Sequence, residues 1–213
     1  MRFNDRDQSS VIPLMYLALL DFESVLVPEL WPILGDALGL PELLLTTRQV
    51  SDKIELNAIR LRALKKSGVT VAQIEKILEK VEPLPGAGEF LDWLGVQIPF
   101  VIVSDCFRPM ALPLLKKLGM PTMISHNWQT RGGRVSALPL RTSAKDTKAP
   151  VVRTFQKLGF NVFATGDSLN DLGMLRAADT ARWFRPSPRA LILAPEIKVS
   201  KSYTELRKVI SKL

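Results

Sequence analysis

Two acidic residues follow the first strongly apolar segment of this sequence at a spacing that suits chemistry. Residues 17–20 are apolar and lead into Asp21, and Glu23 comes two positions later. Because side chains alternate along an extended chain, the two carboxylates would project to the same side of a strand end. Such a pair suits an oxygen nucleophile with a proton shuttle, or a divalent cation site. Buried apolar segments often end in an acid, so this pattern is not specific by itself.

Three further segments carry reactive or charged side chains. An apolar segment at 162–165 is followed by a compact polar group: Gly166, Asp167, Ser168, Asn170 and Asp171. An N-capped helix would explain only one or two of these residues. Another apolar segment, residues 100–103, leads into Ser104 and Asp105, and Lys148 precedes an amphipathic stretch. Apolar segments that each end in polar groups predict strand ends that converge on one site.

The four groups, in this order, resemble the four motifs of haloacid dehalogenase-type phosphohydrolases. The resemblance covers nearly the whole chain from about residue 17 and is highly specific as a set. Within that superfamily the chain is similar to the phosphoserine phosphatase branch, and to the bacterial phosphoserine:homoserine phosphotransferase type in particular, which also carries Asp-x-Glu at the first motif. Further matching stretches are residues 25–31, 60–62 and 89–94.

The resemblance implies that Asp21 attacks phosphorus and forms an aspartyl-phosphate, which splits one difficult displacement into two easier ones. It implies that Glu23 is the general acid and base for the leaving and attacking oxygens. Ser104 would donate a hydrogen bond to a phosphoryl oxygen, and Lys148 would offset the charge of the nucleophile and phosphate. Lys145 is a rival for this last role, but the spacing to the following helix favours Lys148.

The resemblance also implies a Mg²⁺ site made of oxygen ligands. Asp21, Asp167 and the backbone carbonyl of Glu23 are the expected ligands, and Asp171 is expected to hold a metal-bound water. Asn170 is expected to support the loop or contact the phosphate. The ion would allow a carboxylate to approach an anionic phosphate.

Substrate selection is expected to come from an inserted cap. By resemblance, Glu29 would accept the substrate ammonium and Arg60 would clamp its carboxylate. Asp105, beside Ser104, is a further candidate for substrate contact. The alternatives are that Glu29 is only an acid in the first turn of a helix and that Arg60 is a surface or packing residue.

The element pattern predicts an α/β fold with a Rossmann-like parallel sheet and helices on both faces. Apolar periodicity predicts helices at 28–40, 46–66 and 70–82, with no strand between them, which in the family would be a small helical cap inserted after strand 1. The expected division is a core of residues 1–28 and 83–213 and a cap of residues 29–82. Core strands are expected at 11–20, 100–103, 123–125, 161–165 and 181–184, with a glycine- and arginine-rich loop around Gly132 and Gly133 and closing helices after the last strand.

Composition limits the alternatives. The chain has 213 residues, 46% of them hydrophobic and 23% charged, which is ordinary for a globular protein. One cysteine fits a reducing, cytoplasmic location, and no segment approaches the length of a membrane span. The net charge of +8 would help to attract an anionic, phosphorylated substrate, and no nucleic-acid motif accompanies it. A monomer or a homodimer is expected.

Two other functions remain open from the sequence. Because Ser24 and Cys106 depart from the family pattern, the substrate could be another small phosphomonoester. Alternatively, the chain could be a binding protein that kept the fold and lost turnover, although the intact motifs argue against this. His126 is the only histidine and has no partner at metal-ligand spacing, so a packing or loop role is favoured for it, and Cys106 is expected to line the site without acting as a nucleophile.

Overall fold

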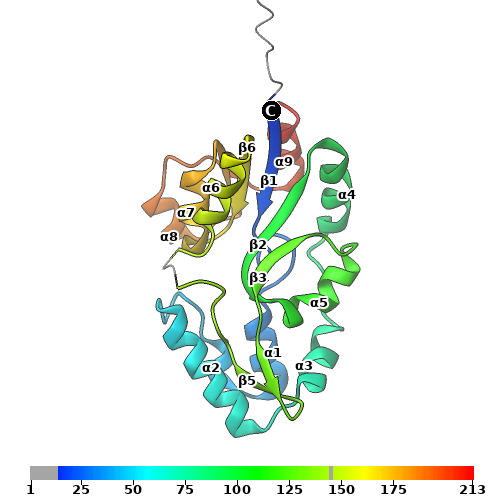
Figure 1. The fold of residues 1–213 in the computed structure, drawn as a ribbon, viewed down its shortest axis with the longest axis vertical. Helices are drawn as coiled ribbons and strands as arrows, with labels where there is room; N and C mark the ends of the chain where they lie inside the picture. The colour runs from blue at the N-terminus through cyan, green and yellow to red at the C-terminus, as the bar shows by residue number, and fades with distance from the viewer. Residues whose placement is uncertain (1–13, 144–145) are drawn as a thin grey trace, which may run out of the picture.

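A parallel sheet with helices on both faces forms the centre of the computed structural model, which describes residues 14–143 and 146–213 (Figure 1). Six strands make this sheet in the order β3-β2-β1-β6-β7-β8, all in parallel, and β4 and β5 form a separate antiparallel hairpin. The strands are β1 (Met15–Leu20), β2 (Phe100–Phe107), β3 (Met123–His126), β4 (Gln129–Arg131), β5 (Arg134–Ala137), β6 (Phe160–Gly166), β7 (Thr180–Phe184) and β8 (Val199–Ser200). The expected α/β architecture is confirmed.

Nine α-helices and two short 3₁₀ turns lie in the described residues. The α-helices are α1 (Leu30–Leu38), α2 (Lys53–Ser67), α3 (Val71–Leu78), α4 (Ala87–Gln97), α5 (Arg108–Lys117), α6 (Ala149–Lys157), α7 (Leu172–Ala177), α8 (Pro188–Leu193) and α9 (Tyr203–Ile210). The 3₁₀ turns are η1 (Pro41–Leu44) and η2 (Leu169–Asp171). None of the helices described here is long and apolar enough to cross a lipid bilayer.

Strand β1 is buried on both faces, which explains why its sequence is continuously apolar. Leu17 and Leu19 pack into the hydrophobic cluster formed with α6, α7 and α8. Ala18 and Leu20, which point the opposite way, pack into the larger cluster formed with α4, α5 and α9. Packing on both faces therefore fixes the position of β1. It also fixes the position of Asp21, the residue that follows this strand.

The helices between β1 and α4 lie at one end of the sheet, at the bottom of Figure 1, together with the β4–β5 hairpin. The hairpin contacts this group through backbone bonds: the Val71 amide donates to the Gly133 carbonyl at 2.9 Å. Arg134 Nε donates to the Gly68 carbonyl at 3.0 Å. The glycine- and arginine-rich sequence predicted only a loop at these residues. Gly132 and Gly133 both have positive φ, which allows the tight turn of the hairpin. The alternation of apolar and polar residues did not by itself predict this turn.

The expected helix at 46–66 is wrong in its first part. Helix α2 begins at Lys53, where Asp52 accepts hydrogen bonds from the Ile54 and Glu55 amides and so caps the helix. Upstream, Thr46 and Gln49 bond to each other through side chain and backbone, which offers the chain an alternative to the helix. Residues 46–52 form a loop instead.

Strand boundaries also differ from expectation at functional positions. Strand β2 continues to Phe107 instead of ending at Val103, and its register with β3 shifts between these two residues. Ser104 and Asp105 lie within this irregular part of the strand. At the far edge, the two-residue strand β8 was not predicted, because two residues carry no periodic signal. Residues 11–13 of the expected first strand lie outside the described part of the chain.

Candidate active site

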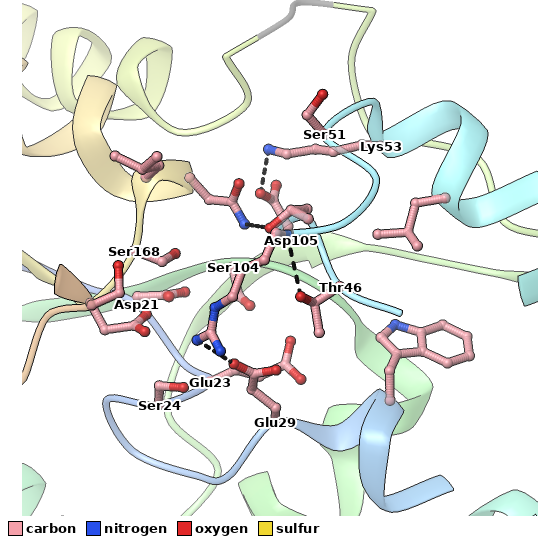
Figure 2. Close-up of a pocket in the computed structure, with 18 of the residues that line it drawn as sticks. Asp21, Glu23, Ser24, Glu29, Thr46, Ser51, Lys53, Ser104, Asp105 and Ser168 are labelled. Carbon is pink, nitrogen blue, oxygen red and sulfur yellow. Dashed lines mark hydrogen bonds and ion pairs between the residues drawn. The ribbon is translucent and has the colours of Figure 1, made fainter. Parts of the chain in front are cut away.

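Strand ends from distant parts of the chain meet in one cavity of about 790 Å³. Asp21 follows β1, Asp167 follows β6 and Ser104 lies in the irregular part of β2, and all three line this cavity. They are 6%, 7% and 5% exposed. Figure 2 shows the carboxylate of Asp21 and Ser104 within the cavity, with Glu23 and Glu29 on the side of α1. The expected convergence at the carboxyl edge of the sheet is therefore observed.

Lys148 lies at the centre of the charged groups. Its Nζ donates to Asp21 Oδ1 and to Asp171 Oδ1, both at 2.6 Å. The lysine is 2% exposed and Asp171 is fully buried. Burial would lower the pKa of Lys148, but Asp171 and Asp21 outweigh it and hold this pKa well above its usual value. Lys145, the rival for this position, lies outside the described residues.

The loop after β6 holds Asp171 through its backbone. The amides of Asp167 and Ser168 both donate to Asp171 Oδ2 at 3.1 Å. This geometry needs a glycine at position 166: a Cβ there would lie 2.3 Å from Asp171 Cγ. The glycine of the Gly-Asp-Ser sequence is therefore required by the position of the Asp171 carboxylate, which also contacts the Lys148 ammonium.

The acidic cluster is suited to a divalent cation. Oxygen atoms of Asp21, Asp167 and Asp171 lie within 4.8 Å of one another. Three carboxylates face one ammonium, so negative charge exceeds positive charge in a buried region. Burial and the Asp171 carboxylate raise the pKa of Asp21 well above its usual value, and the same two causes raise the pKa of Asp167 to about 7. In the part of the chain that the structure describes, the Asp167 side chain has no protein hydrogen-bond partner, so it is free to bind a ligand.

Glu23 connects the core to the first cap helix. Its Oε1 accepts a hydrogen bond from the Leu30 amide at 2.7 Å, at the N-terminus of α1. Burial raises the pKa of Glu23, and the Leu30 amide and the Arg60 guanidinium partly oppose this shift. Between Asp21 and α1 the chain turns at Ser24, which has φ of +61°, a left-handed conformation that is uncommon for a residue other than glycine.

Two predicted substrate residues line the cavity from the cap side. Arg60 is 8% exposed, lies 4.6 Å from the Trp31 ring centroid and donates from Nη2 to the Leu45 carbonyl at 2.7 Å. Its Nε is buried without a hydrogen-bond partner. Glu29 accepts a hydrogen bond from Arg48 at 3.1 Å. Arg60 is therefore buried and not a surface residue, whereas the Glu29 side chain is 32% exposed and pairs with an exposed arginine.

Asp105 and Asn170 also line the cavity, but both have protein partners. Asn170 Nδ2 donates to Thr47 Oγ1 in the cap-side loop at 3.3 Å. Asp105 accepts from Lys53 on one oxygen and from Thr147 on the other, both at 2.5 Å. The predicted substrate contact of Asp105 therefore competes with two existing bonds. Sequence reasoning missed Lys53, because nothing in a helix pattern shows which lysine reaches across to the core.

His126 and Cys106, the other two candidates from the sequence, are both buried. His126 is 2% exposed, accepts a bond from the Arg141 amide at Nδ1 and lies 5.7 Å from the Phe107 ring. Cys106 is buried, and burial raises the pKa of its thiol well above the usual value, so a reactive thiolate is disfavoured.

A doubly covered parallel sheet, with buried carboxylates and a lysine at its strand ends beneath a helical cap, defines a capped α/β enzyme. Residues 15–176 match the family model of haloacid dehalogenase-like hydrolases. The chain belongs to this family, which confirms the expected family, the fold and the assignment as a hydrolase.

Similar proteins point to one branch of the family. The chain is 37% identical over 193 residues to a phosphoserine phosphatase of Pseudomonas syringae pv. tomato, covering 90% of this chain and 81% of that protein. It is 35% identical to the phosphoserine phosphatase ThrH of Pseudomonas aeruginosa, covering 91% and 94% of the two chains. A crystal structure of apo phosphoserine phosphatase superposes with a TM-score of 0.76 at 21% identity, over 91% of this chain and 98% of the other. A substrate-bound phosphoserine phosphatase gives a TM-score of 0.71 at 20% identity, over 93% and 98%. The two solved structures support the fold.

The geometry around Gly166 yields a test. We expect Gly166→Ala to lower the rate of phosphomonoester hydrolysis by about 100-fold, because the new Cβ displaces the Asp171 carboxylate and with it the Lys148 ammonium. Steady-state assays with an aryl phosphate would measure this loss.

Gly88→Ala is the matched control, since no atom lies within 4 Å of a Cβ at that position in α4. It should leave the rate unchanged and slightly stabilise the helix. Equal rates for the two alanine variants would contradict the proposed reason for a glycine at 166.

Proposed function

We propose that this enzyme is a Mg²⁺-dependent phosphoserine phosphatase that acts through an aspartyl-phosphate on Asp21. The observation that supports it most is the ion pair between Lys148 and Asp21, a buried carboxylate at a strand end. Asp167 and Ser104 line the same cavity, and the buried Asp171 carboxylate lies beside them. Both curated relatives described above are named phosphoserine phosphatases.

Asp21 would attack phosphorus with the carboxylate oxygen that Lys148 does not hold. In the described structure only Oδ1 of Asp21 is engaged by the ammonium, so Oδ2 remains for the attack. The Lys148 ammonium would offset the charge of the carboxylate and the arriving phosphate together. Ser104, 5% exposed and lining the same cavity, would donate its hydroxyl to a phosphoryl oxygen.

Glu23 would act as the general acid for the serine oxygen and then as the general base for the attacking acceptor. It lies two residues from Asp21 and lines the same cavity. The bond from the Leu30 amide holds one of its oxygens and leaves the other for a proton. Proton transfer of this kind contributes about 100- to 10,000-fold to a rate.

Asp21, Asp167 and the backbone carbonyl of Glu23 would hold Mg²⁺, with Asp171 supporting a bound water. When bound, the ion would lower the repulsion between carboxylate and phosphate and stabilise the transferring group. The excess of acidic over basic groups in the cluster supports this assignment.

Phosphoserine would be selected by the cap. The Arg60 guanidinium, with its orphaned Nε, would clamp the substrate carboxylate, and Glu29 would accept the ammonium. The Arg48 side chain, 61% exposed, now bonds to Glu29 and would have to share that carboxylate with the substrate. Another small phosphomonoester is the alternative substrate, because the cavity is far larger than a phosphate group.

The first test is hydrolysis of phosphoserine with and without Mg²⁺. We expect a chelator to abolish release of phosphate and Mg²⁺ to restore it, because the carboxylate cluster repels an anionic substrate. Asp21→Asn should lower the rate about 1,000-fold or more, since an amide is a poor nucleophile.

Asp36→Asn, an exposed change on α1, is the control for the amide substitution and should retain full activity. A wild-type enzyme that hydrolyses other phosphomonoesters but leaves phosphoserine intact would overturn the substrate assignment. An active Asp21→Asn enzyme would overturn the nucleophile.

The second test concerns the carboxylate clamp. Arg60→Ala should raise the KM for phosphoserine by about 10- to 100-fold, because a charge-assisted contact is lost, and should change the KM for an aryl phosphate far less. Arg62→Ala, exposed on the same helix, should change neither. Equal effects of Arg60→Ala on both substrates would refute the clamp.

The third test concerns the acceptor. Glutamate at position 23 places its carboxyl about one carbon–carbon bond further out than aspartate would, comparable with an N–Cα bond length. We propose that this lets an alcohol such as homoserine compete with water. Incubation of phosphoserine with saturating homoserine should then give phosphohomoserine, and free phosphate as the sole product would exclude the transfer.

A further inference from the structure

One ion pair joins the cap helix α2 to the core strand β2 at the cavity. Lys53 is the first residue of α2, and its Nζ donates to Asp105 Oδ2 at 2.5 Å. Figure 2 shows this contact reaching from α2 to Asp105 next to Ser104. The two side chains are only 18% and 19% exposed, so water screens the pair less than an ordinary surface salt bridge.

Asp105 has one further hydrogen-bond donor and one charged or polar neighbour in the core. Thr147 Oγ1 donates to Asp105 Oδ1 at 2.5 Å. His126 Nε2 lies 3.4 Å from the same oxygen. Since His126 Nδ1 accepts the Arg141 amide at 3.0 Å, the imidazole carries its proton on Nε2, facing Asp105. The Asp105 carboxylate therefore lies next to Lys53 from the cap and to Thr147 and His126 from the core.

These contacts lie next to two residues of the proposed reaction. Asp105 directly follows Ser104, and Thr147 directly precedes Lys148. Lys53 Nζ is also 3.5 Å from Thr147 Oγ1. The Asp105 carboxylate is thus one residue from Ser104 in the chain and is bonded to the residue before Lys148.

The carboxylate of Asp105 is held in its charged form. Burial alone would raise its pKa, but the contacts with His126, Lys148 and Lys53 outweigh burial and hold this pKa well below its usual range. A charged Asp105 is the form that a cap-borne ammonium can recognise.

We propose that Lys53 and Asp105 are a positioning pair, in which closure of the cap delivers the Lys53 ammonium to Asp105 and thereby fixes Ser104 and Thr147-Lys148 for phosphoryl transfer. This inference rests on the proposed function. Lys53 lies on α2 and Asp105 on β2, so any movement of α2 away from the core separates the pair. The reaction centre is then complete only while the cap is closed.

The kinetic test uses Lys53→Met, which keeps the length of the side chain and removes its charge. We expect its kcat for an aryl phosphate and for phosphoserine to fall by about 10-fold, with a smaller change in KM, because bound substrate meets a misplaced Ser104 and Lys148. Lys53→Arg should recover most of the loss. Lys66→Met, an exposed change at the other end of α2, is the matched control and should leave kcat unchanged.

A double-mutant cycle separates a coupled pair from two independent residues. If Lys53 acts through Asp105, adding Lys53→Met to Asp105→Asn should lower kcat no further than Asp105→Asn alone. Multiplicative losses in the double variant, or a Lys53→Met enzyme within twofold of wild type, would overturn the proposal.

Hydrogen exchange tests the same inference without turnover. Lys53→Met should speed amide exchange in the first turn of α2 and also around residues 146–150 in the core, whereas Lys66→Met should change neither. Unaltered exchange around 146–150 would overturn the coupling. Failure of the wild type to hydrolyse phosphoserine would instead overturn the proposed substrate and leave the exchange and aryl-phosphate results to decide the positioning pair.

Discussion

The buried ammonium of Lys148 between two carboxylates is the interaction on which the site depends. Three carboxylates this close repel one another in a buried region, which favours their protonation, and the lysine opposes this by its charge. Removal of one partner from such a buried pair leaves an uncompensated charge, which is far more costly than loss of a surface ion pair. The lysine therefore stabilises the arrangement of carboxylates in which we propose that a cation and a phosphate bind.

The sheet meets this requirement by bringing distant segments together at one edge. Parallel strands end on the same side, so the residues after β1 and β6 meet without any long loop. The third residue, Ser104, does not follow a strand end. It lies where the register of β2 with β3 shifts, and its side chain lines the cavity. The close approach of Asp171 to Gly166 then gives the last loop a single geometry.

Contacts between cap and core extend the site beyond the strand ends. Lys53 bonds to Asp105, and Asn170 bonds to Thr47, so polar groups near the proposed reaction are bonded to the helical segment that follows β1. Glu23 adds a third link, since it accepts the first amide of α1. These three bonds are the physical basis of the proposed coupling between the cap and the reacting groups.

The sequence by itself indicated the family through the resemblance of its four motifs, which include Lys148. It also predicted the parallel sheet and the convergence of Asp21, Ser104 and Asp167, because apolar segments that end in polar residues leave a local pattern. It did not determine the β4–β5 hairpin, the loop before α2 or the partners of Asp105. Those depend on glycine conformations, on capping by side chains and on contacts between residues 42 and 52 positions apart. Only the tertiary structure decides such contacts, because they form when separate elements pack and no local periodicity encodes them.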